Sequence, residues 1–587
     1  MRLIRKTMWT YLEFPYETEN FQEEFEKGLK GFTGIRPDGY QYAPAYKRGI
    51  WDGYTHFYDD KNHRIPTGMA NKVMEFVKKT QLSHPDFGVV VVDEYPEAFI
   101  APEDFPEEIT FQDGEDTFTL RDYQYNSVKE GILNDTGIIN LATNSGKSGT
   151  SVGFIKTLYP YLERGEKVAY IVPSKAIFKQ AVATMTANFG ENKVGYMGDD
   201  KRKLREINVI MMPSLVSGLK DPTNEVKLTG KNRANQLFVE EVLPVLDGHS
   251  NLRGLITNFL RNYRSAQKMT KAREEIVESL EYMLSENLSD KQIQLRLNNE
   301  KVRFQKLMRS KVKNKYDRWE EVKELVADTK VVIVDEGHHS KADSYYETLL
   351  RFENAQYRFA LSGSVDKSDK MAWQRLQAIY GDEVYQVSNE EMISRGISAK
   401  PYIRFLNIRK EVPLDNPRNY MEVYDKAIVN NPERNTYIAD FTSAFYQTGK
   451  KVLIIVNRVE HGEIIMEMLE ERGVPSEFIN GAVSSDERTR QLDDIKTGKL
   501  RVLIATGVLD EGVDVKGGLD MLVMAGSGKS LRLILQRVGR VLRKRSSGEN
   551  TSVVLDFYDR SDPTVYRHSE ERMAIYANEG FDISFLN

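Results

Sequence analysis

One loop of this sequence has residue types that can bind a phosphate group. An apolar run at 138–142 predicts a buried strand, and the small residues after it lead through Gly146-Lys147-Ser148 into a predicted helix. The N–H groups of such a turn and the helix N-terminus can face phosphate oxygens. Lys147 would reach the β- and γ-phosphates, and the Ser148 hydroxyl would ligate Mg²⁺. Leu141 stands where the full motif has its first glycine, so the loop alone is a weak signal.

A pair of carboxylates strengthens that signal. Residues 331–334 form an apolar strand that ends in Asp335-Glu336-Gly337-His338. At the end of a buried strand, Asp335 can hold Mg²⁺ and Glu336 can orient a water molecule. Two carboxylates in that position would be costly without a metal ion. The loop and the acidic pair together predict a nucleotide–metal site.

Two arginines late in the chain could act on the same site. Residues 536–544 form a predicted helix that carries Gln536, Arg540 and Arg543. The two arginines are three residues apart and therefore share one helix face. Two cations on that face could stabilise charge on a γ-phosphate bound by the other half of the chain. The alternative is a basic surface patch with no catalytic role.

A glutamine before the loop could recognise the base of the nucleotide. Gln124 lies in the segment Leu120-Arg121-Asp122-Tyr123-Gln124, which heads a predicted helix. Its amide has one donor group and one acceptor, which match the edge of adenine. The alternative is a solvated helix residue.

A second loop looks more like a phosphate-binding motif than the first. Gly526-Ser527-Gly528-Lys529-Ser530 has the glycines, and the run 553–556 imitates a partner strand. However, only five residues separate Ser530 from Gln536, and no acidic pair follows at a strand end. We interpret it as a loop that leads into the arginine helix, with Lys529 non-catalytic.

Several predicted strands end in small or polar residues. Open α/β sheets bind ligands at the carboxyl ends of their strands, so these residues are candidates for contacts. In the first half they are Pro173, Ser174, Lys175 and Ser214. Ser362-Gly363-Ser364 follows a further strand, and its hydroxyls could couple γ-phosphate chemistry to movement. In the second half they are Asn457, Thr506 and Gly507. The repeated strands predict two α/β halves that meet near Lys400-Pro401.

Three segments lie outside this pattern. Residues 1–100 predict a small α/β unit, whose segment 39–53 mixes aromatic and cationic residues that could stack on bases or form a small aromatic core. Residues 101–118 are rich in Pro, Asp and Glu and predict a linker. Residues 251–329 predict long helices, and the run 301–315 has seven cations and no acid. That run fits an amphipathic helix whose basic face follows a phosphate backbone, or a solvated helical hairpin.

Composition limits the classes of protein. A chain of 587 residues, 40% hydrophobic and 29% charged, predicts three or four soluble domains. No apolar run approaches the roughly 20 residues that span a bilayer, and the first residues lack a secretory signal, so we expect a cytoplasmic protein without membrane contact. The absence of cysteine excludes disulfides and thiolate chemistry. A net charge of −5 means that any nucleic-acid surface must be a local basic patch.

In order along the chain, these motifs resemble those of superfamily 2 helicases, most closely the phage UvsW-type helicases. The resemblance covers about 120 to 545 and rests on Gln124, Gly146-Lys147-Ser148, Asp335-Glu336-Gly337-His338, Ser362-Gly363-Ser364, Thr506-Gly507 and Gln536-x-x-Gly-Arg-x-x-Arg. The segment from Tyr40 to Gly53 is similar to one in the small N-terminal domain of that family. The family also has a Lys-Ser loop just before its arginine helix.

The resemblance implies an α/β fold with two tandem RecA-like domains and ATP with Mg²⁺ in the cleft between them. By position, the implied catalytic residues are Lys147, Asp335, Glu336, Gln536, Arg540 and Arg543. The implied nucleotide-binding residues are Arg121, Gln124, Thr143, Asn144, Ser145, Gly146, Lys147 and Ser148, with Ser148 and Asp335 on the metal. Leu141 and Asn144 depart from glycines that are common in this loop, although related phage enzymes vary there too.

The same comparison implies residues that contact nucleic acid. Those that match positions along the tracked backbone are Pro173, Ser174, Lys175, Ser214, Asn457, Thr506 and Gly507. Lys301, Arg303 and Lys306 are added from the basic run. That run lies in an insertion longer than the family core requires, so its role does not transfer from the family.

The prediction is an ATP-dependent DNA helicase that unwinds, anneals or branch-migrates branched or partly duplex DNA in recombination, repair or replication. Its alternatives are a double-stranded DNA translocase, an RNA helicase, and a non-catalytic nucleic-acid-binding or annealing module. We expect a monomer in the cytoplasm, that of the host if the chain is phage-encoded. The expected domains are a DNA-binding accessory domain at 1–100, a linker at 101–118, RecA-like domain 1 at 119–400 with a helical insertion at about 219–327, and RecA-like domain 2 at 401–587.

Overall fold

The computed structural model describes most of the chain, in two compact units. The described residues are 1–15, 19–37, 39–114, 116–142, 144–225, 233–249, 251–266, 269–286, 288–409, 420–507, 519–528, 530–539 and 551–586. One unit comprises Met1–Val216 and Val326–Asn587, and the other comprises Ser217–Leu325. No helix in the described ranges has the length and apolarity needed to cross a bilayer.

The first large sheet carries the loop and the acidic pair. Its strand order is β10 (Lys201–Lys203), β9 (Val194–Gly198), β11 (Ile207–Met211), β8 (Lys167–Val172), β12 (Thr329–Asp335), β13 (Tyr357–Ser362), β7 (Thr136–Leu141), β14 (Glu383–Val387). Every neighbouring pair is parallel except β10 with β9. The central strands are runs of Val, Ile, Leu and Ala because helices cover both of their faces.

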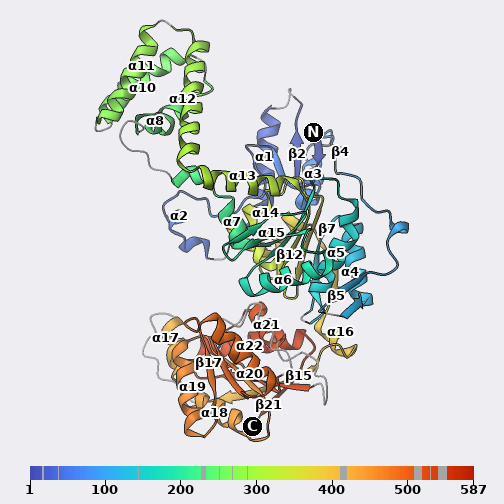
Figure 1. Ribbon diagram of the computed structural model, residues 1–587. Helices are drawn as coiled ribbons and strands as arrows, with labels where there is room; N and C mark the ends of the chain where they lie inside the picture. Colours follow the sequence, from blue (N-terminus) through green and yellow to red (C-terminus); the bar gives the residue numbers. More distant parts are fainter. Residues whose placement is uncertain are drawn as a thin grey trace. The chain divides into compact units, whose positions relative to one another are not determined.

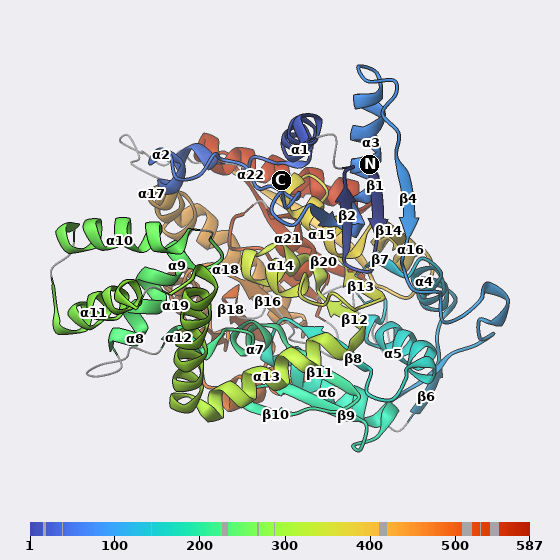
Figure 2. The same cartoon turned by 90° about the horizontal axis from the view of Figure 1, so that it is seen from above.

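The helices of this domain lie in two layers. On one face, the core packs the sheet against α4 (Asp122–Leu133), α5 (Lys147–Leu158) and α6 (Lys175–Phe189). Figure 2 shows α14 (Asp343–Leu349) and α15 (Lys370–Tyr380) on the opposite side of β12 and β13 from α5 and α6. The carboxyl ends of β7, β8, β11 and β12 therefore meet at one edge, where the predicted site residues follow the strands.

The second large sheet has the same construction. Its order is β17 (Glu477–Ile479), β18 (Val502–Ala505), β16 (Val452–Ile455), β19 (Met521–Val523), β20 (Thr551–Asp559), β15 (Lys400–Ile408), β21 (Asp582–Leu586), with all pairs parallel. Its helices are α17 (Tyr420–Tyr424), α18 (Pro432–Gln447), α19 (Val459–Glu471), α20 (Ser485–Thr497), α21 (Leu531–Gly539) and α22 (Pro563–Asn578) (Figure 1). The predicted class, α/β with two domains built on parallel sheets, is confirmed.

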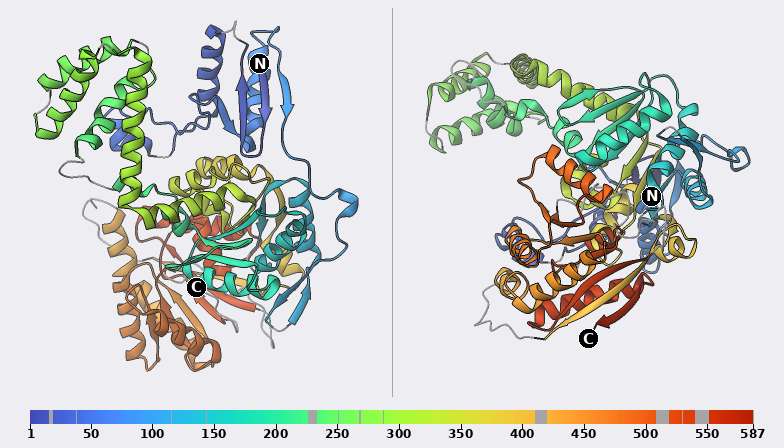
Figure 3. Two further views of the ribbon diagram at one scale, coloured as in Figure 1. Left: turned by 45° about the horizontal axis from the view of Figure 1, so that its top comes forward. Right: turned by 60° about the horizontal axis from the view of Figure 1, so that its bottom comes forward.

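The N-terminal residues form a smaller sheet. Its strands are β3 (Arg64–Pro66), β2 (Trp9–Glu13), β1 (Arg2–Arg5) and β4 (Val90–Asp93), in that order. A shared core joins the sheet to α1 (Glu19–Thr33) and α3 (Ala70–Gln81), which appear in blue in Figure 3. The segment expected as a linker has structure of its own. β5 (Thr110–Asp113) and β6 (Asp116–Thr119) form a hairpin, and the side chain of Asn188 bonds to the backbone of Gln112.

The second unit is helical, with a hydrophobic core of its own. Its helices are α8 (Arg233–Leu237), α9 (Leu243–Leu246), α10 (Leu252–Ala266), α11 (Lys271–Ser285), α12 (Asp290–Lys311) and α13 (Lys313–Asp328) (Figure 3). One expectation is wrong here: the basic run 301–315 is not a single amphipathic helix, because α12 ends at Lys311 and α13 begins at Lys313. Its cations therefore belong to two helices.

Candidate active site

The backbone of the predicted phosphate-binding loop adopts left-handed conformations at two positions. β7 ends at Leu141 and α5 begins at Lys147, so the loop joins a buried strand to a helix N-terminus as predicted. Asn144 has φ 68° and Gly146 has φ 81°. Asparagine tolerates this region better than most residues, which explains how it can stand where related loops have glycine. Glycine is needed at 146 for two reasons: its φ is positive, and a Cβ there would lie 2.4 Å from Gln124 Nε2.

The side chain of Gln124 holds the loop through hydrogen bonds to its backbone. Its Oε1 accepts a hydrogen bond from the Arg121 N–H (2.9 Å), and its Nε2 donates to the carbonyl oxygens of Ser145 (2.8 Å) and Gly146 (3.1 Å). The neighbouring Tyr123 hydroxyl also donates to the Ser145 carbonyl, at 3.0 Å. Gln124 is only 4% exposed, so the alternative of a solvated helix residue is wrong. In this structure its amide positions the loop.

The loop lysine meets the acidic pair. Lys147 Nζ lies 3.1 Å from Glu336 Oε1. Glu336 itself has φ 49°, and its N–H donates to Asp335 Oδ1 at 2.9 Å. A left-handed glutamate is unusual, and such strain persists where the surroundings fix it. The conformation sets both carboxylates at the end of β12, beside the loop.

The charged groups of this cluster shift one another's pKa values. Burial and the charge of Glu336 raise the pKa of Asp335 to about 6. Burial would also raise the pKa of Glu336, but the Lys147 ammonium outweighs it and holds that pKa below its ordinary value. For Lys147, burial is opposed by Glu336 and Asp335, and its pKa stays above the usual value. The cluster therefore keeps a charged ammonium beside a charged glutamate.

A buried histidine links the acidic pair to the next strand. His338 Nδ1 lies 2.9 Å from Ser362 Oγ and 3.3 Å from Glu336 Oε2. Gly363 follows that serine, and a Cβ on it would lie 2.8 Å from the Leu141 carbonyl and 3.3 Å from Lys147 Nζ. The hydroxyl-rich end of β13 thus contacts both halves of the predicted site.

These residues fit a nucleotide with Mg²⁺. The loop presents a left-handed pair of backbone positions before a helix N-terminus, the usual cradle for a phosphate. The Ser145 hydroxyl is fully buried and has no partner among the described residues. No group of three or more His, Cys, Asp or Glu that could hold a metal occurs in the described part of the chain. Mg²⁺ at phosphates commonly takes only one or two protein ligands, and Ser148 and Asp335 are the candidates in this chain.

The predicted contact residues of the first domain follow two adjacent strands. Pro173, Ser174 and Lys175 come after β8, and Ser214 lies in the first turn of α7 (Met212–Gly218), after β11. β8 and β11 pair in parallel, with Met211 opposite Val172, so both strand ends meet at one edge of the sheet. Lys175 is exposed and forms an ion pair with Asp199. Ser174 starts α6 with a buried hydroxyl that has no described partner.

In the second domain, Asn457 connects two predicted elements. Its Oδ1 accepts from Arg537 of α21 (2.9 Å), and its Nδ2 donates to the Ser527 carbonyl (2.7 Å). Thr506 follows β18, with its N–H bonded to the Ile479 carbonyl and its hydroxyl buried without a described partner. Gly507 comes next and is exposed.

The second glycine-rich loop is held by its carbonyls. Arg572 donates to the Gly528 carbonyl (3.1 Å) and to Ser527 Oγ (3.3 Å), while its Nε lies 3.1 Å from both oxygens of Asp556. Asp556, the residue that imitates an acidic strand end, is thereby committed to a buried ion pair. This geometry supports the interpretation that the loop is not the nucleotide site.

Several predicted residues cannot be placed. Thr143, Lys529, Arg540 and Arg543 lie outside the described residues. Gln536 lies in α21, whose backbone is described, but its side chain is not.

The basic run of the helical unit divides into paired and unpaired cations. Lys301 pairs with Asp247 (2.9 Å) and Arg303 with Glu300 (3.8 Å). Lys306, Lys313 and Lys315 are exposed and make no ion pair with a described residue. All five are available to solvent on α12 and the start of α13.

Some site residues escape prediction from sequence. The Tyr170 hydroxyl donates to Asp335 Oδ2 at 3.4 Å from the middle of β8. A tyrosine inside an otherwise aliphatic strand could have drawn attention to it. Arg395 binds both carboxylate oxygens of Asp122, at 2.8 and 2.6 Å, in the turn that begins α4. Nothing in the sequence connects two residues so far apart.

Comparison with known proteins agrees with these motifs. Residues 434–545 match the family described as "Helicase conserved C-terminal domain", and 117–242 match "Type III restriction enzyme, res subunit". The chain is 22% identical over 610 aligned positions to "ATP-dependent DNA helicase uvsW" of Enterobacteria phage T4, covering 98% of this chain and 97% of that protein. A helicase-named protein of Sulfolobus islandicus filamentous virus is 28% identical over 280 residues, 46% of this chain and 49% of that one.

A solved structure is also similar. The crystal structure of T4 UvsW aligns with 100% of this chain and 98% of its own, at 18% identity and a TM-score of 0.41. One family match lies in the second α/β domain, the other covers part of the first α/β domain and extends into the helical unit, and the T4 relative spans nearly the whole chain. The two family matches and the T4 relative therefore support a superfamily 2 helicase related to the UvsW type.

Proposed function

We propose that this helicase acts on DNA and that it uses ATP to remodel branched or partly duplex DNA by unwinding, annealing or branch migration. The observation that carries ATP dependence is the convergence of Lys147 on Glu336 beside a loop with two left-handed positions. The choice of DNA rests on the printed name of the T4 relative. Recombination, repair or replication is the cellular context that such substrates imply.

Each residue of the first domain has a role in this proposal. Lys147 and the loop N–H groups bind the phosphates, and Ser148 and Asp335 hold the metal ion. Bound Mg²⁺ would supply positive charge at the phosphates during transfer to water. Glu336 orients that water, and its lowered pKa keeps it a charged acceptor. His338 contacts both Glu336 and Ser362, and so connects Glu336 to the end of β13. In this proposal, that contact couples γ-phosphate chemistry to movement of β13.

In this proposal, the second domain supplies positive charge at the γ-phosphate and part of the contacts with the nucleic-acid strand. We assign Arg540 and Arg543 to the γ-phosphate, with Gln536 on the same helix. Asn457, Thr506 and Gly507 contact the nucleic-acid backbone together with Pro173, Ser174, Lys175 and Ser214 of the first domain. The N-terminal domain adds exposed Tyr42, Lys47 and Arg48 beside a half-buried cluster in which Tyr40 and Tyr46 pack edge to face at 4.9 Å. We propose that this surface binds DNA as an accessory.

The central test is ATP hydrolysis by Lys147→Ala. We expect loss of turnover with DNA binding largely intact, because the substitution removes the ammonium that reaches the phosphates and leaves the strand contacts unchanged. Lys529→Ala is the matched control, since it removes the lysine of the other glycine-rich loop, and it should hydrolyse ATP at the wild-type rate. Retained turnover in Lys147→Ala would disprove the assignment of the site.

The substrate is tested by comparing nucleic acids side by side. ATPase stimulation is measured with single-stranded, double-stranded and forked DNA and with RNA, alongside strand separation on the fork. Strongest stimulation and unwinding with forked DNA supports the proposal. Stimulation by duplex without strand separation would instead identify a translocase, and a preference for RNA would identify an RNA helicase. Absence of hydrolysis with every polymer would leave a non-catalytic binding or annealing module.

A further inference from the structure

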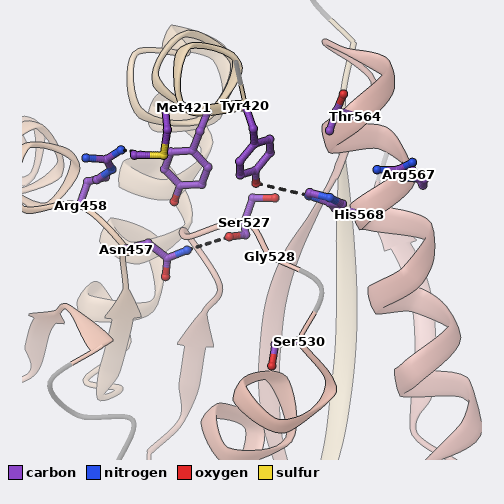
Figure 4. Close-up of a pocket in the computed structure, with 11 residues that line it drawn as sticks. Tyr420, Met421, Asn457, Arg458, Ser527, Gly528, Ser530, Thr564, Arg567 and His568 are labelled. Carbon is purple, nitrogen blue, oxygen red and sulfur yellow. Dashed lines mark hydrogen bonds between the residues drawn. The ribbon is translucent and has the colours of Figure 1, made fainter. Parts of the chain in front are cut away.

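The second domain contains a pocket that the nucleotide site does not use. It has a volume of about 620 Å³ and lies where β16 and β19 end, between α17 and the N-terminal part of α22 (Figure 4). The glycine-rich loop 526–528, which does not form the nucleotide site, supplies part of its wall. The volume falls within the range of about 300–1,000 Å³ that is usual for sites of small molecules.

One side of the pocket is aromatic. The Tyr420 ring lies 5.3 Å from the His568 ring at an interplanar angle of 64°, and its hydroxyl is 3.3 Å from His568 Nδ1. Tyr420 is 39% exposed and Met421 is 53% exposed, although both are large apolar side chains. Exposed aromatic faces fixed in this way are surfaces on which a planar ring can stack.

The polar part of the lining is positively charged. Arg458 and Arg567 are exposed, and none of the described residues that line the pocket is a carboxylate. Arg458 donates to the Met421 sulfur at 3.4 Å and makes no ion pair with a described residue. Among the described residues, the ion pair of Arg567 is a long contact of 3.8 Å with Glu571 on its own helix. Both guanidinium groups are therefore available to an anion.

A buried tyrosine also borders this pocket. Tyr424 is 5% exposed and lines the pocket beside Asn457 and Ser527. Burial raises the pKa of its hydroxyl, and the neighbouring Asn457 side chain and Ser527 backbone act in the opposite direction. This part of the wall is therefore held by contacts within the domain.

We propose that the pocket holds one nucleotide of a single-stranded nucleic acid, with its base stacked on Tyr420, which packs against His568, and its phosphate on Arg458 and Arg567. Planar stacking surfaces beside guanidinium groups match the chemistry of a nucleotide. Asn457, assigned above to the strand backbone, borders the same pocket. This inference rests on the proposed function. It adds a contact with a base to the contacts with the strand backbone that are proposed above.

Hydrogen bonds from two arginines hold the wall of the pocket in place. Arg434 donates to the carbonyls of Met524 (3.3 Å) and Ala525 (2.8 Å), directly before the loop, and Arg572 holds the loop itself. Both arginines are buried. A base held against such a wall would fix the strand to the second domain.

The test compares strands with and without bases. Equilibrium binding is measured between the full chain and two oligomers of about 12 nucleotides, oligodeoxythymidylate and a fully abasic strand of equal length. The wild-type chain should prefer the strand with bases. Tyr420→Ala should reduce that preference about tenfold, while Tyr420→Phe should keep it because the ring remains. Arg567→Gln should weaken both strands alike.

Tyr161→Ala is the matched control, because Tyr161 is also exposed (48%) but lies in the first domain. It should leave the preference unchanged. An unchanged preference in Tyr420→Ala, with the fold verified by thermal unfolding, would overturn the proposal. So would binding of free thymidine monophosphate to wild type and not to Tyr420→Ala, since the pocket would then serve free nucleotides. DNA-stimulated ATPase of the wild type, measured separately, tests the proposed function, so the two can fail independently.

Discussion

At the scale of the residue, the proposed phosphate-binding loop depends on a side chain outside it. The Gln124 amide donates to two loop carbonyls and accepts one N–H at the start of α4. In Gln124→Glu the carboxylate keeps the acceptor but faces the Ser145 and Gly146 carbonyls without a donor. A lost hydrogen bond and an unsatisfied buried group cost about 1–3 kcal/mol. We expect the KM for ATP to rise about tenfold or more, because the loop loses its bound shape.

The measurement is steady-state ATP hydrolysis with saturating DNA. Gln447→Glu is the control, since it makes the same chemical change at an exposed position at the end of α18. It should leave KM unaltered. If Gln124→Glu also has the wild-type KM, then the contacts to Ser145 and Gly146 do not organise the loop.

His461 makes the second domain sensitive to acid. It is fully buried in α19, with its Nε2 on Asn435 Oδ1 at 2.9 Å, and burial with nearby Arg434 lowers its pKa to about 3. In the unfolded chain its pKa is about 6.5, so between these values the unfolded state binds the proton and the folded state does not. This residue therefore costs no stability above about pH 6.5 and lowers stability progressively as the pH falls below that value.

The expected size follows from the same linkage. Between about pH 7.5 and 5.5 the wild type should lose about 1.3 kcal/mol more than His461→Gln, which can still donate to Asn435 but cannot be protonated. Urea unfolding followed at both pH values measures the difference. Equal pH dependence of the two proteins would show that His461 is protonated in the folded chain.

At the scale of the element, the strands of both sheets are predictable, but the contacts between their ends are not. Runs such as 331–334 are long enough and apolar enough to identify buried parallel strands from their residue types. The same pattern cannot show that Arg434 reaches Asp559, 125 positions later, because no local period connects them. The break at Val312 is also hidden, since neither proline nor glycine marks it. Local signals identify elements, and tertiary packing decides how they pair.

One glycine fixes the N-terminal sheet on the first α/β domain. A Cβ on Gly68 would lie 1.9 Å from the Gln377 carbonyl oxygen and 2.9 Å from the Gly381 nitrogen, both backbone atoms of or beside α15. Backbone atoms cannot turn away as a side chain can, so Gly68→Ala must separate the two surfaces. We expect a cost of about 1–3 kcal/mol, seen as a lower melting temperature and faster proteolysis at 101–118.

Gly31→Ala is the control for this change. Gly31 lies in α1 of the same domain, and a Cβ on it would meet nothing within 4 Å. Its helix position also gains from alanine, so its stability should be equal or slightly higher. A protease pattern for Gly68→Ala identical to that of Gly31→Ala would contradict the tight packing of Gly68 on α15.

At the scale of the whole molecule, the helical unit is built to be separable. Its core is its own, and its two ends meet: a Cβ on Gly218 would contact Val322 at 3.3 Å, and Trp319 Nε1 donates to the Leu219 carbonyl at 3.3 Å. Replacing 225–314 with a short flexible linker would keep this closing contact. We expect ATP hydrolysis without DNA to persist, because the residues proposed for the nucleotide site all lie outside the excised segment. DNA affinity and unwinding should fall. Unchanged DNA binding and unwinding would show that the helical unit has no part in either activity.

Charge neutralisation tests the same unit without removing it. In the triple substitution Arg303→Gln, Lys306→Gln and Lys313→Gln, three exposed cations are lost from α12 and the start of α13. Each cation that neutralises a phosphate contributes about 0.7–0.9 to the slope of log affinity against log salt, so the slope should become shallower by about 2. Lys271→Gln with Lys291→Gln removes exposed cations from the same unit and outside the basic run, and this control should keep the wild-type slope. The comparison separates a DNA-binding surface from general charge: a slope that changes equally per lost cation in both proteins would mean that the basic run has no specific contact with the phosphate backbone.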